Sequence, residues 1–400
     1  MTEGDGSGFT EPIVERYLEL GLAVGRHIDG FVDAYYGPPA LARRVDAEPI
    51  RPPAQLADAA RRLVGELDAD TSLEPGRRRW IRGQAAGLHV SASKLAGEAI
   101  NYEDEVEACY GVRPRRVEED ELAAAHRLLA SALPGRGPLA SRLIEWRESH
   151  AIPVNKLEAA VRSLADELRE RTDALFGLPE GEGIVWELVT NEPWAGFNYY
   201  LGGLQSRVAI NTDLPVLSTS LVHLVAHEAY PGHHTEHSLK EVGLVRHRQQ
   251  AEETIFLVGT PQCLLAEGLA DLGAEVLLGP RPEPTVASHL RPMGIRYDTD
   301  VVARVAQAGE GLIGLRGNVA LLLHKDGADP DVAIDYLSRW GLQSRPRAAK
   351  TVEFLMNPTW RAYMTCYVEG LPLCRRFVAG EPGRFRRLLT EQLLPADLAA

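Results

Sequence analysis

Apolar positions along the first part of the chain recur at helical spacing. Between residues 11 and 35, Ile13, Tyr17, Leu20 and Val24 fall on one side of a helix. Further patterns rich in Ala, Leu, Arg and Glu, which are good helix formers, cover 54–67, 72–100, 118–133, 139–150 and a stretch ending near Phe176. We therefore expect residues 1–176 to form a scaffold lobe of packed helices.

The pattern changes after a glycine-rich linker at residues 177–183. Residues 184–189 read as a strand, and the apolar runs 198–201 and 205–211 flank Gly202-Gly203, a hairpin signal. We expect a small sheet there. Its exposed edge could hold a peptide by strand addition, although a purely structural hairpin is an equally good interpretation.

Helical spacing returns beyond this sheet. We expect helices over about 220–230, 233–240, 246–258 and 262–278, and more between 285 and 393, with breaks at Asp326-Gly327, Gly341 and Asn357-Pro358. The predicted fold class is mainly α. Residues 184–400 would form a second lobe, joined with 1–176 into one integrated fold.

A histidine-rich stretch stands at the centre of the second lobe. Five of the twelve histidines lie between His223 and His237. His227-Glu228 is typical of a zincin helix, in which a histidine ligand is followed by a glutamate that acts as general base. The position one turn after His227 is Pro231, so we expect a break there that delays the second ligand to His233. His234 is the rival ligand, because it lies seven residues after His227.

A third ligand is expected from another helix, because catalytic zinc sites use three protein ligands and keep one position open. Glu267 and Asp271 are four residues apart and share a helix face. We predict that Glu267 binds the metal and that Asp271 receives the free ring N–H of a ligand histidine. A solvated acidic face is the alternative, which the surrounding leucines make less favourable.

The series His227-Glu228-x-x-Pro231-Gly232-His233-His234 resembles the signature of a bacterial family known as domain of unknown function 885. The folds of that family are similar to helical zinc carboxypeptidases of the Taq type. The resemblance extends from about Tyr199 to Phe377. It implies a helical zincin-like metallopeptidase fold with one Zn²⁺ per chain and a small sheet beside the active-site helix.

Two further pairs carry the same resemblance. Glu267-Gly268 resembles a Glu-Gly pair of that family, and Tyr367-Val368-Glu369-Gly370 resembles its Tyr-x-x-Gly. By this likeness Tyr367 would donate a hydrogen bond to the developing oxyanion. Tyr363 lies one helical turn earlier and is the expected substrate contact, although both tyrosines could simply be core residues.

The remaining candidates complete the predicted site. Glu228 would be the general base, and His234 would have a catalytic role if it is not a ligand. Arg207 could bind a substrate carboxylate through two hydrogen bonds, with Arg296, Arg316 and Arg361 as alternatives.

Composition limits the possible partners. The net charge of −13 argues against a nucleic-acid binder and gives no support to an anionic membrane surface. The sequence contains no run of about 18 apolar residues, so no membrane span is predicted. The acidic N-terminus lacks the features of a signal peptide. The four cysteines, Cys109, Cys263, Cys366 and Cys374, form no close pair in sequence and are expected to be reduced thiols in a cytoplasm.

The sequence thus favours a zinc metallohydrolase, most of all a carboxypeptidase or dipeptidase-like enzyme that cleaves short peptides. An amidohydrolase acting on a small non-peptide metabolite is the second enzyme hypothesis. A helical binding protein whose metal only stabilises the fold is the alternative from another class.

Overall fold

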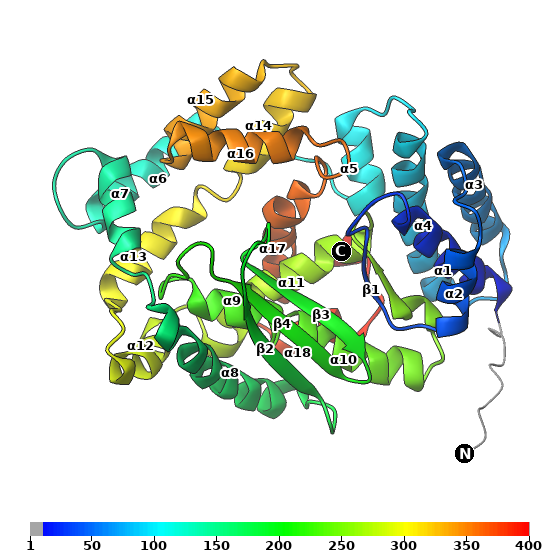
Figure 1. Ribbon diagram of the computed structural model, residues 1–400, viewed down its shortest axis with the longest axis horizontal. Coiled ribbons are helices and arrows are strands. Elements are labelled where there is room, and N and C mark those ends of the chain that lie inside the picture. The colour runs from blue at the N-terminus through cyan, green and yellow to red at the C-terminus, as the bar shows by residue number, and fades with distance from the viewer. Residues whose placement is uncertain (1–10, 400) are drawn as a thin grey trace.

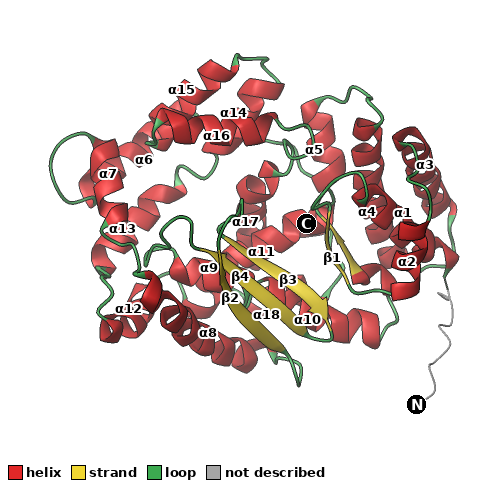
Figure 2. Ribbon diagram, viewed as in Figure 1, coloured by secondary structure: helices red, strands yellow, loops and turns green. Residues whose placement is uncertain are grey.

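The computed structural model describes residues 11–399 and is mainly α-helical (Figures 1 and 2). The helices before the sheet are α1 (Pro12–Gly25), α2 (Pro39–Ala47), α3 (Pro53–Ala69), α4 (Pro75–Leu95), α5 (Tyr102–Tyr110), α6 (Glu119–Ala132), α7 (Leu139–Glu148) and α8 (Val154–Phe176). Those after it are α9 (Leu221–Glu228), α10 (His233–Lys240), α11 (Pro261–Leu278), α12 (Glu283–Leu290), α13 (Thr299–Glu310), α14 (Leu315–His324), α15 (Pro330–Gly341), α16 (Arg345–Met356), α17 (Met364–Val378), α18 (Pro382–Thr390) and α19 (Pro395–Leu398).

Two small sheets interrupt the helices. One has the order β2-β4-β3, from β2 (Gly183–Val189), β3 (Gly196–Gly202) and β4 (Gln205–Asn211). β3 and β4 form the predicted antiparallel hairpin, while β2 runs parallel to β4. The second sheet pairs β1 (Val32–Tyr35) with β5 (Ile255–Leu257). Figure 2 shows the three-stranded sheet in front of α9, α10 and α18.

Two sequence predictions were wrong at this second sheet. The helix predicted over 11–35 ends at Gly25, and its last part forms β1. The helix predicted over 246–258 is replaced by a short 3₁₀ turn (Ala251–Thr254) and β5, after a π-helical turn (Glu241–Arg246) that follows α10. Both stretches gain strand hydrogen bonds from a partner far away in the sequence, which local periodicity does not reveal.

The buried apolar residues form two cores. The larger core includes side chains of α5 to α9 and of α11 to α18. The smaller core is built from α1 to α4, together with Ile255 and Leu257 of β5. Successive side chains of β5 point into different cores, so the β1–β5 sheet lies between the two cores.

The most extensive packing between two helices in the second part of the chain is that of α11 against α17, which lie side by side in Figure 1. It depends on two glycines. A Cβ atom at Gly268 would lie 2.4 Å from the carbonyl oxygen of Gly370, so the two backbones touch where larger residues would separate them. This crossing fixes the distance between the acidic face of α11 and the tyrosines of α17. Within residues 11–399, no helix is long and apolar enough to cross a membrane.

Candidate metal centre

The predicted break after His227 is present. α9 ends at Glu228, α10 begins at His233, and the Tyr230–Pro231 peptide bond between them is cis. Gly232 folds back on the end of α9, where its N–H donates to the carbonyl oxygen of Ala226 at 2.9 Å. A Cβ atom at Gly232 would lie 2.0 Å from the carbonyl oxygen of His227, so only glycine fits. The turn places His233 at the start of α10, facing back toward His227.

Three predicted ligands meet at one point. The Nε2 atom of His233 lies 3.1 Å from Nε2 of His227, and Nε2 of His227 lies 3.3 Å from Oε2 of Glu267. The three ligand atoms are all within 4.8 Å of one another. In a tetrahedral site with bonds of 2.0–2.1 Å, neighbouring ligand atoms are about 3.3 Å apart, so this spacing fits Zn²⁺.

One carboxylate oxygen of this group has no hydrogen-bond partner. Oε2 of Glu267 is buried and makes no hydrogen bond. Burial, together with the charge on His227, lowers the pKa of His233 to about 4. A neutral imidazole and an unpartnered carboxylate oxygen are the forms in which these side chains bind a metal.

Asp271 lies where the sequence placed it. Its Oδ1 accepts the Nδ1–H of His227 at 2.9 Å, so Nε2 of that ring is free to face the ligand group. Burial opposes a charge on His227, but the contacts with Asp271 and Glu267 raise its pKa well above the usual value. His223 also approaches Oδ1 of Asp271, at 3.4 Å, from a side chain that is 54% exposed. His223 is thus a neighbour of Asp271 and is not part of the ligand group.

Glu228 is buried beside the ligands, and its carboxylate forms no ion pair within residues 11–399. Burial raises the pKa of Glu228 to about 7, the charge on His227 lowers it, and Glu267 raises it again. The backbone at Glu228 is held by Asn198 of β3, whose Nδ2 donates to the Glu228 carbonyl oxygen at 2.5 Å. A carboxylate with a pKa near 7 can both accept and return a proton at neutral pH.

The two tyrosines of α17 reach the same centre. The hydroxyl of Tyr363 donates to Oε1 of Glu267 at 2.9 Å and lies 2.8 Å from the hydroxyl of Tyr367. Burial raises the pKa of both tyrosines well above the usual value, so both hydroxyls keep their protons. Tyr363 therefore orients Glu267, a predicted ligand. The hydroxyl of Tyr367 is linked to Glu267 through that of Tyr363.

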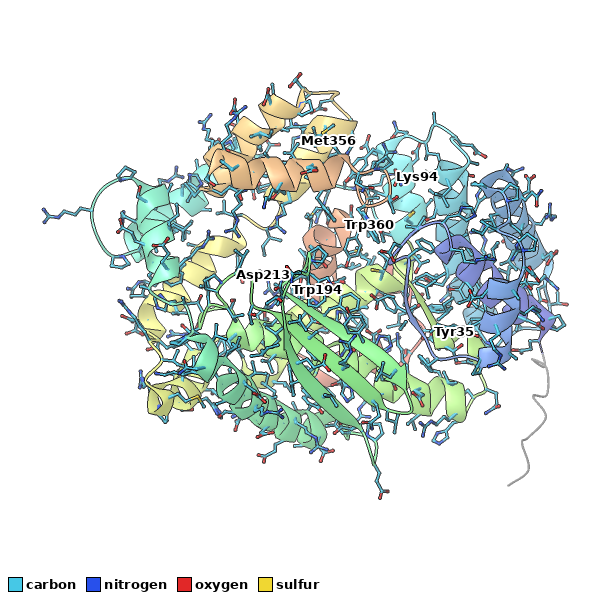
Figure 3. All side chains as sticks on the ribbon, in the orientation of Figure 1. Tyr35, Lys94, Trp194, Asp213, Met356 and Trp360 are labelled. Carbon is cyan, nitrogen blue, oxygen red and sulfur yellow. The ribbon has the colours of Figure 1, made fainter. Side chains whose placement is uncertain are left out.

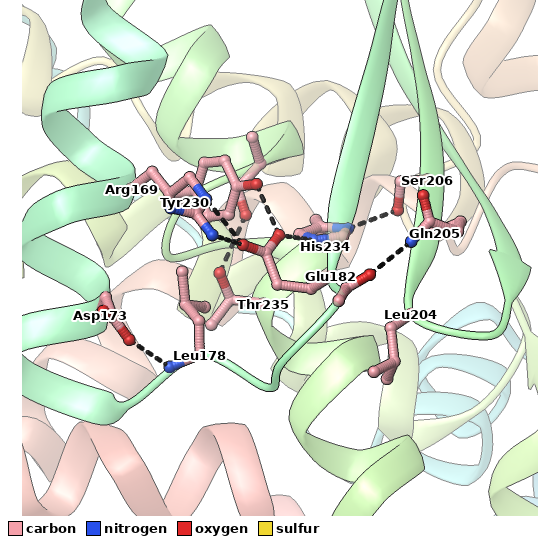
Figure 4. Close-up of polar contacts among 12 residues, drawn as sticks. Arg169, Asp173, Leu178, Glu182, Leu204, Gln205, Ser206, Tyr230, His234 and Thr235 are labelled. Atoms are coloured by element: carbon pink, nitrogen blue, oxygen red, sulfur yellow. Dashed lines mark hydrogen bonds and ion pairs between the residues drawn. The ribbon is translucent and has the colours of Figure 1, made fainter.

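Both ring nitrogens of His234 are engaged by Glu182 and Ser206, which argues against the ligand or catalytic role expected for it (Figure 4). Its Nε2 lies 2.8 Å from Oε2 of Glu182, and its Nδ1 lies 2.8 Å from the hydroxyl of Ser206. Tyr230 donates to the same Glu182 oxygen at 2.7 Å. The side chains of His234 and Glu182 are completely buried, so no substrate can reach them. This network anchors the turn before α10 and thereby holds His233 in place.

Arg207 is also placed apart from the ligand group. It lies on the opposite face of the sheet from Ser206 and is stacked on the ring of Tyr199, 3.9 Å from the centroid. Its Nη1 pairs with Glu187 at 3.0 Å. Arg361, one of the alternatives, is paired with Glu105 at 2.6 Å.

Sequence reasoning missed two residues of this region, Asp33 and Asn198. Asp33 belongs to a strand that was predicted as helix, and neither residue is part of a recognisable motif. Withdrawal from water raises the pKa of Asp33 to about 7, and the charges of Glu267 and Glu228 add to this effect. The charge of Asp33 therefore interacts with the charges of Glu267, a predicted ligand, and Glu228.

A cavity of about 70 Å³ lies behind the tyrosines and is lined in part by Lys94 and Trp360, which Figure 3 labels. The ring of Trp360 lies 5.9 Å from that of Tyr363. None of the three predicted ligands lines this cavity.

No family model matches the chain, and no curated protein sequence matches it. A solved structure described as "the putative lipoprotein from Colwellia psychrerythraea" is similar, with a TM-score of 0.53 and 15% identity. The match covers 87% of this chain, which spans only 66% of the length of the Colwellia chain. A "putative lipoprotein of unknown function" from Shewanella oneidensis has a TM-score of 0.46 and 13% identity, over 90% of this chain and 74% of its own. At such identities the Colwellia match shows a shared fold alone.

Proposed function

We propose that the chain is a zinc-dependent hydrolase that cleaves amide bonds in short peptides. The observation that carries the proposal is the group of His227, His233 and Glu267, whose ligand atoms have tetrahedral spacing. Asp271 behind His227 and Glu228 beside it add the orienting carboxylate and the base that such hydrolases need.

Each side chain has a role in this proposal. When bound, zinc polarises the scissile carbonyl and lowers the pKa of a water molecule. Glu228 takes the proton of the attacking water and passes it to the leaving amine, which suits a carboxylate with a pKa of about 7. Tyr367, whose hydroxyl lies 2.8 Å from that of Tyr363, is the proposed hydrogen-bond donor to the negative charge that develops on the substrate oxygen.

The position of β3 supports a peptide as substrate. β3 is an edge strand of its sheet, and its Asn198 touches the backbone of Glu228. An extended peptide that added to this edge would lie directly beside the proposed base. Arg207, the first arginine predicted to bind a terminal carboxylate, lies on the outer face of the sheet.

Hydrolysis of a mixed panel of peptides and small amides by zinc-loaded protein tests the proposal. Glu228→Gln should fold, should retain zinc and should lose about 100-fold or more in turnover, the scale of a general base. Glu180→Gln, at an exposed linker position, is the matched control and should behave like the wild type.

The outcome separates the alternatives. Equal turnover by the wild type and Glu228→Gln would refute the mechanism. Cleavage of small amides without peptides would favour the amidohydrolase hypothesis. Absence of turnover on every substrate would favour a metal-stabilised binding protein.

A reducing, cytoplasmic setting is the companion proposal. The four cysteines are free and buried, and the sulfur atoms of Cys263 and Cys366 lie 4.0 Å apart without a bond. Both thiols have a raised pKa because of burial, which disfavours the reactive thiolate. Cell fractionation with an antibody against the chain tests this location.

A further inference from the structure

A β-bulge in β1 directs Asp33 toward the metal centre. Val32 pairs with Leu257 and Ala34 pairs with Phe256, so Asp33 is an extra residue between two neighbouring pairs. A bulge of this kind turns the extra side chain to the same side as the next residue. Ala34 and Phe256 pack in the larger core, together with α9 and α11. β1 packs beside β3, which packs on α9, and β5 packs on α11, so Asp33 lies on the side of the β1–β5 sheet that faces the larger core.

The carboxylate of Asp33 lacks a partner there. It forms no hydrogen bond or ion pair within residues 11–399, and its side chain remains partly accessible. It is also absent from the atoms that lie within 4.8 Å of one another at the ligand group. Asp33 is thus placed outside the group that would hold one ion. Burial raises its pKa, and the charges of Glu267 and Glu228 contribute to that rise.

The charges around the centre do not balance. Four carboxyl groups, those of Glu228, Glu267, Asp271 and Asp33, belong to this region, and a zinc ion would supply two positive charges. Within the described part of the chain, no lysine or arginine is paired with any of these four side chains. The site therefore favours a ligand that carries a positive charge of its own.

Asn198 provides a second unused acceptor. It is only 6% exposed, and its Oδ1 has no hydrogen-bond partner, while its Nδ2 is held by the backbone of Glu228. β1 packs beside β3, the strand that carries Asn198. An ammonium group has three N–H donors and no acceptor, which matches a carboxylate and an amide oxygen that both lack donors.

We propose that Asp33, with the amide oxygen of Asn198, binds the ammonium group at the amino terminus of the peptide substrate. This inference rests on the proposed function, because it assumes that a peptide bond is presented to His227, His233 and Glu267. It makes the enzyme a hydrolase for peptides with a free amino terminus, of the aminopeptidase or dipeptidase class. A carboxypeptidase would not need a cationic subsite at this position.

Binding of two inhibitors to zinc-loaded protein tests the inference by calorimetry, without the need for turnover. One is an amino-acid hydroxamate with a free amine, and the other is its N-acetyl derivative. Wild type should bind the free amine about 10- to 100-fold more tightly, the scale of a charged hydrogen bond. Asp33→Asn should bind both with similar affinity. Asp46→Asn removes the same charge at an exposed position of α2 and should keep the preference.

A third inhibitor, the hydroxamate of Nα-acetyl-lysine, distinguishes the source of the ammonium group. It should bind as weakly as the other acetylated compound if the α-amine is recognised, and tight binding would overturn that assignment in favour of a side-chain amine.

Zinc content and affinity decide the remaining outcomes. Asp33→Asn should retain one zinc ion, which also shows that it folds, and loss of zinc would overturn the inference by making Asp33 a ligand. Equal affinity of the wild type for the free and acetylated inhibitors would overturn the inference and leave the proposed function intact. Failure of both inhibitors to bind would refute the proposed function and the inference together.

Discussion

The contact between Gly268 and Gly370 makes Gly268→Ala an informative perturbation. A Cβ atom at Gly268 would lie 2.4 Å from the Gly370 carbonyl oxygen and 2.7 Å from Sγ of Cys374. Carbon and carbonyl oxygen normally approach to about 3.3–3.6 Å, so α11 and α17 would have to separate by about 1 Å. The obstructing atoms of Gly370 are backbone and cannot rotate away.

The magnitude follows from two opposing terms. Overpacking of this kind costs typically about 1–3 kcal/mol, and the rigid backbone contact favours the upper end of that range. Alanine is a better helix former than glycine by about 1 kcal/mol, which offsets part of the cost. We therefore expect Gly268→Ala to lower the free energy of unfolding by about 2 kcal/mol. The same separation would break the 2.9 Å hydrogen bond between Tyr363 and Glu267 and weaken zinc binding.

Urea unfolding followed by circular dichroism measures the first effect, and zinc titration measures the second. Gly65→Ala is the control, because it lies inside α3 and a Cβ atom there would meet nothing within 4 Å. It should stabilise the protein by up to about 1 kcal/mol. If Gly268→Ala were as stable as Gly65→Ala, the close helix crossing and the tyrosine placement derived from it would be wrong.

Four further substitutions probe the centre. His233→Ala should lose zinc, whereas His234→Ala should keep it. His234→Ala should lower the free energy of unfolding by about 1–3 kcal/mol, because Glu182 loses a buried partner. The opposite pattern of zinc content in the two variants would exchange their roles. Asp271→Asn should weaken zinc affinity by about 10- to 100-fold in a competition assay with a chelator, and unchanged affinity would remove it as the orienting group. Tyr367→Phe should lower turnover by about 100-fold or more with little change in KM, and normal turnover would return Tyr367 to a packing role.

The parts of the site that depend on local spacing could be predicted from the sequence. Glu267 and Asp271 lie one turn apart, so their shared direction follows from helix geometry alone. Pro231 cannot continue a helix, so the break after α9 was also predictable. The hairpin of β3 and β4 followed from its central glycines.

The parts that depend on distant pairing could not be predicted. β1 exists because residues 32–35 pair with residues 255–257, and neither segment shows this partner in its own pattern. The helix predicted there would have directed Asp33 elsewhere. The contacts of His234 with Glu182, which comes from the linker before β2, were likewise not visible in the sequence, and they leave His233 as the proposed ligand. Arg207 was misplaced for a related reason, because sequence spacing does not tell which face of a sheet covers the helices.

The zinc content of the purified chain is the most direct measurement of the central claim, that His227, His233 and Glu267 form a metal site. Protein reconstituted with zinc and passed over a desalting column should carry about one equivalent by elemental analysis. Glu267→Ala should carry far less under the same treatment, while the exposed-site variant Glu180→Gln should match the wild type. A wild-type chain that retains no zinc, or a Glu267→Ala chain that retains a full equivalent, would contradict the account.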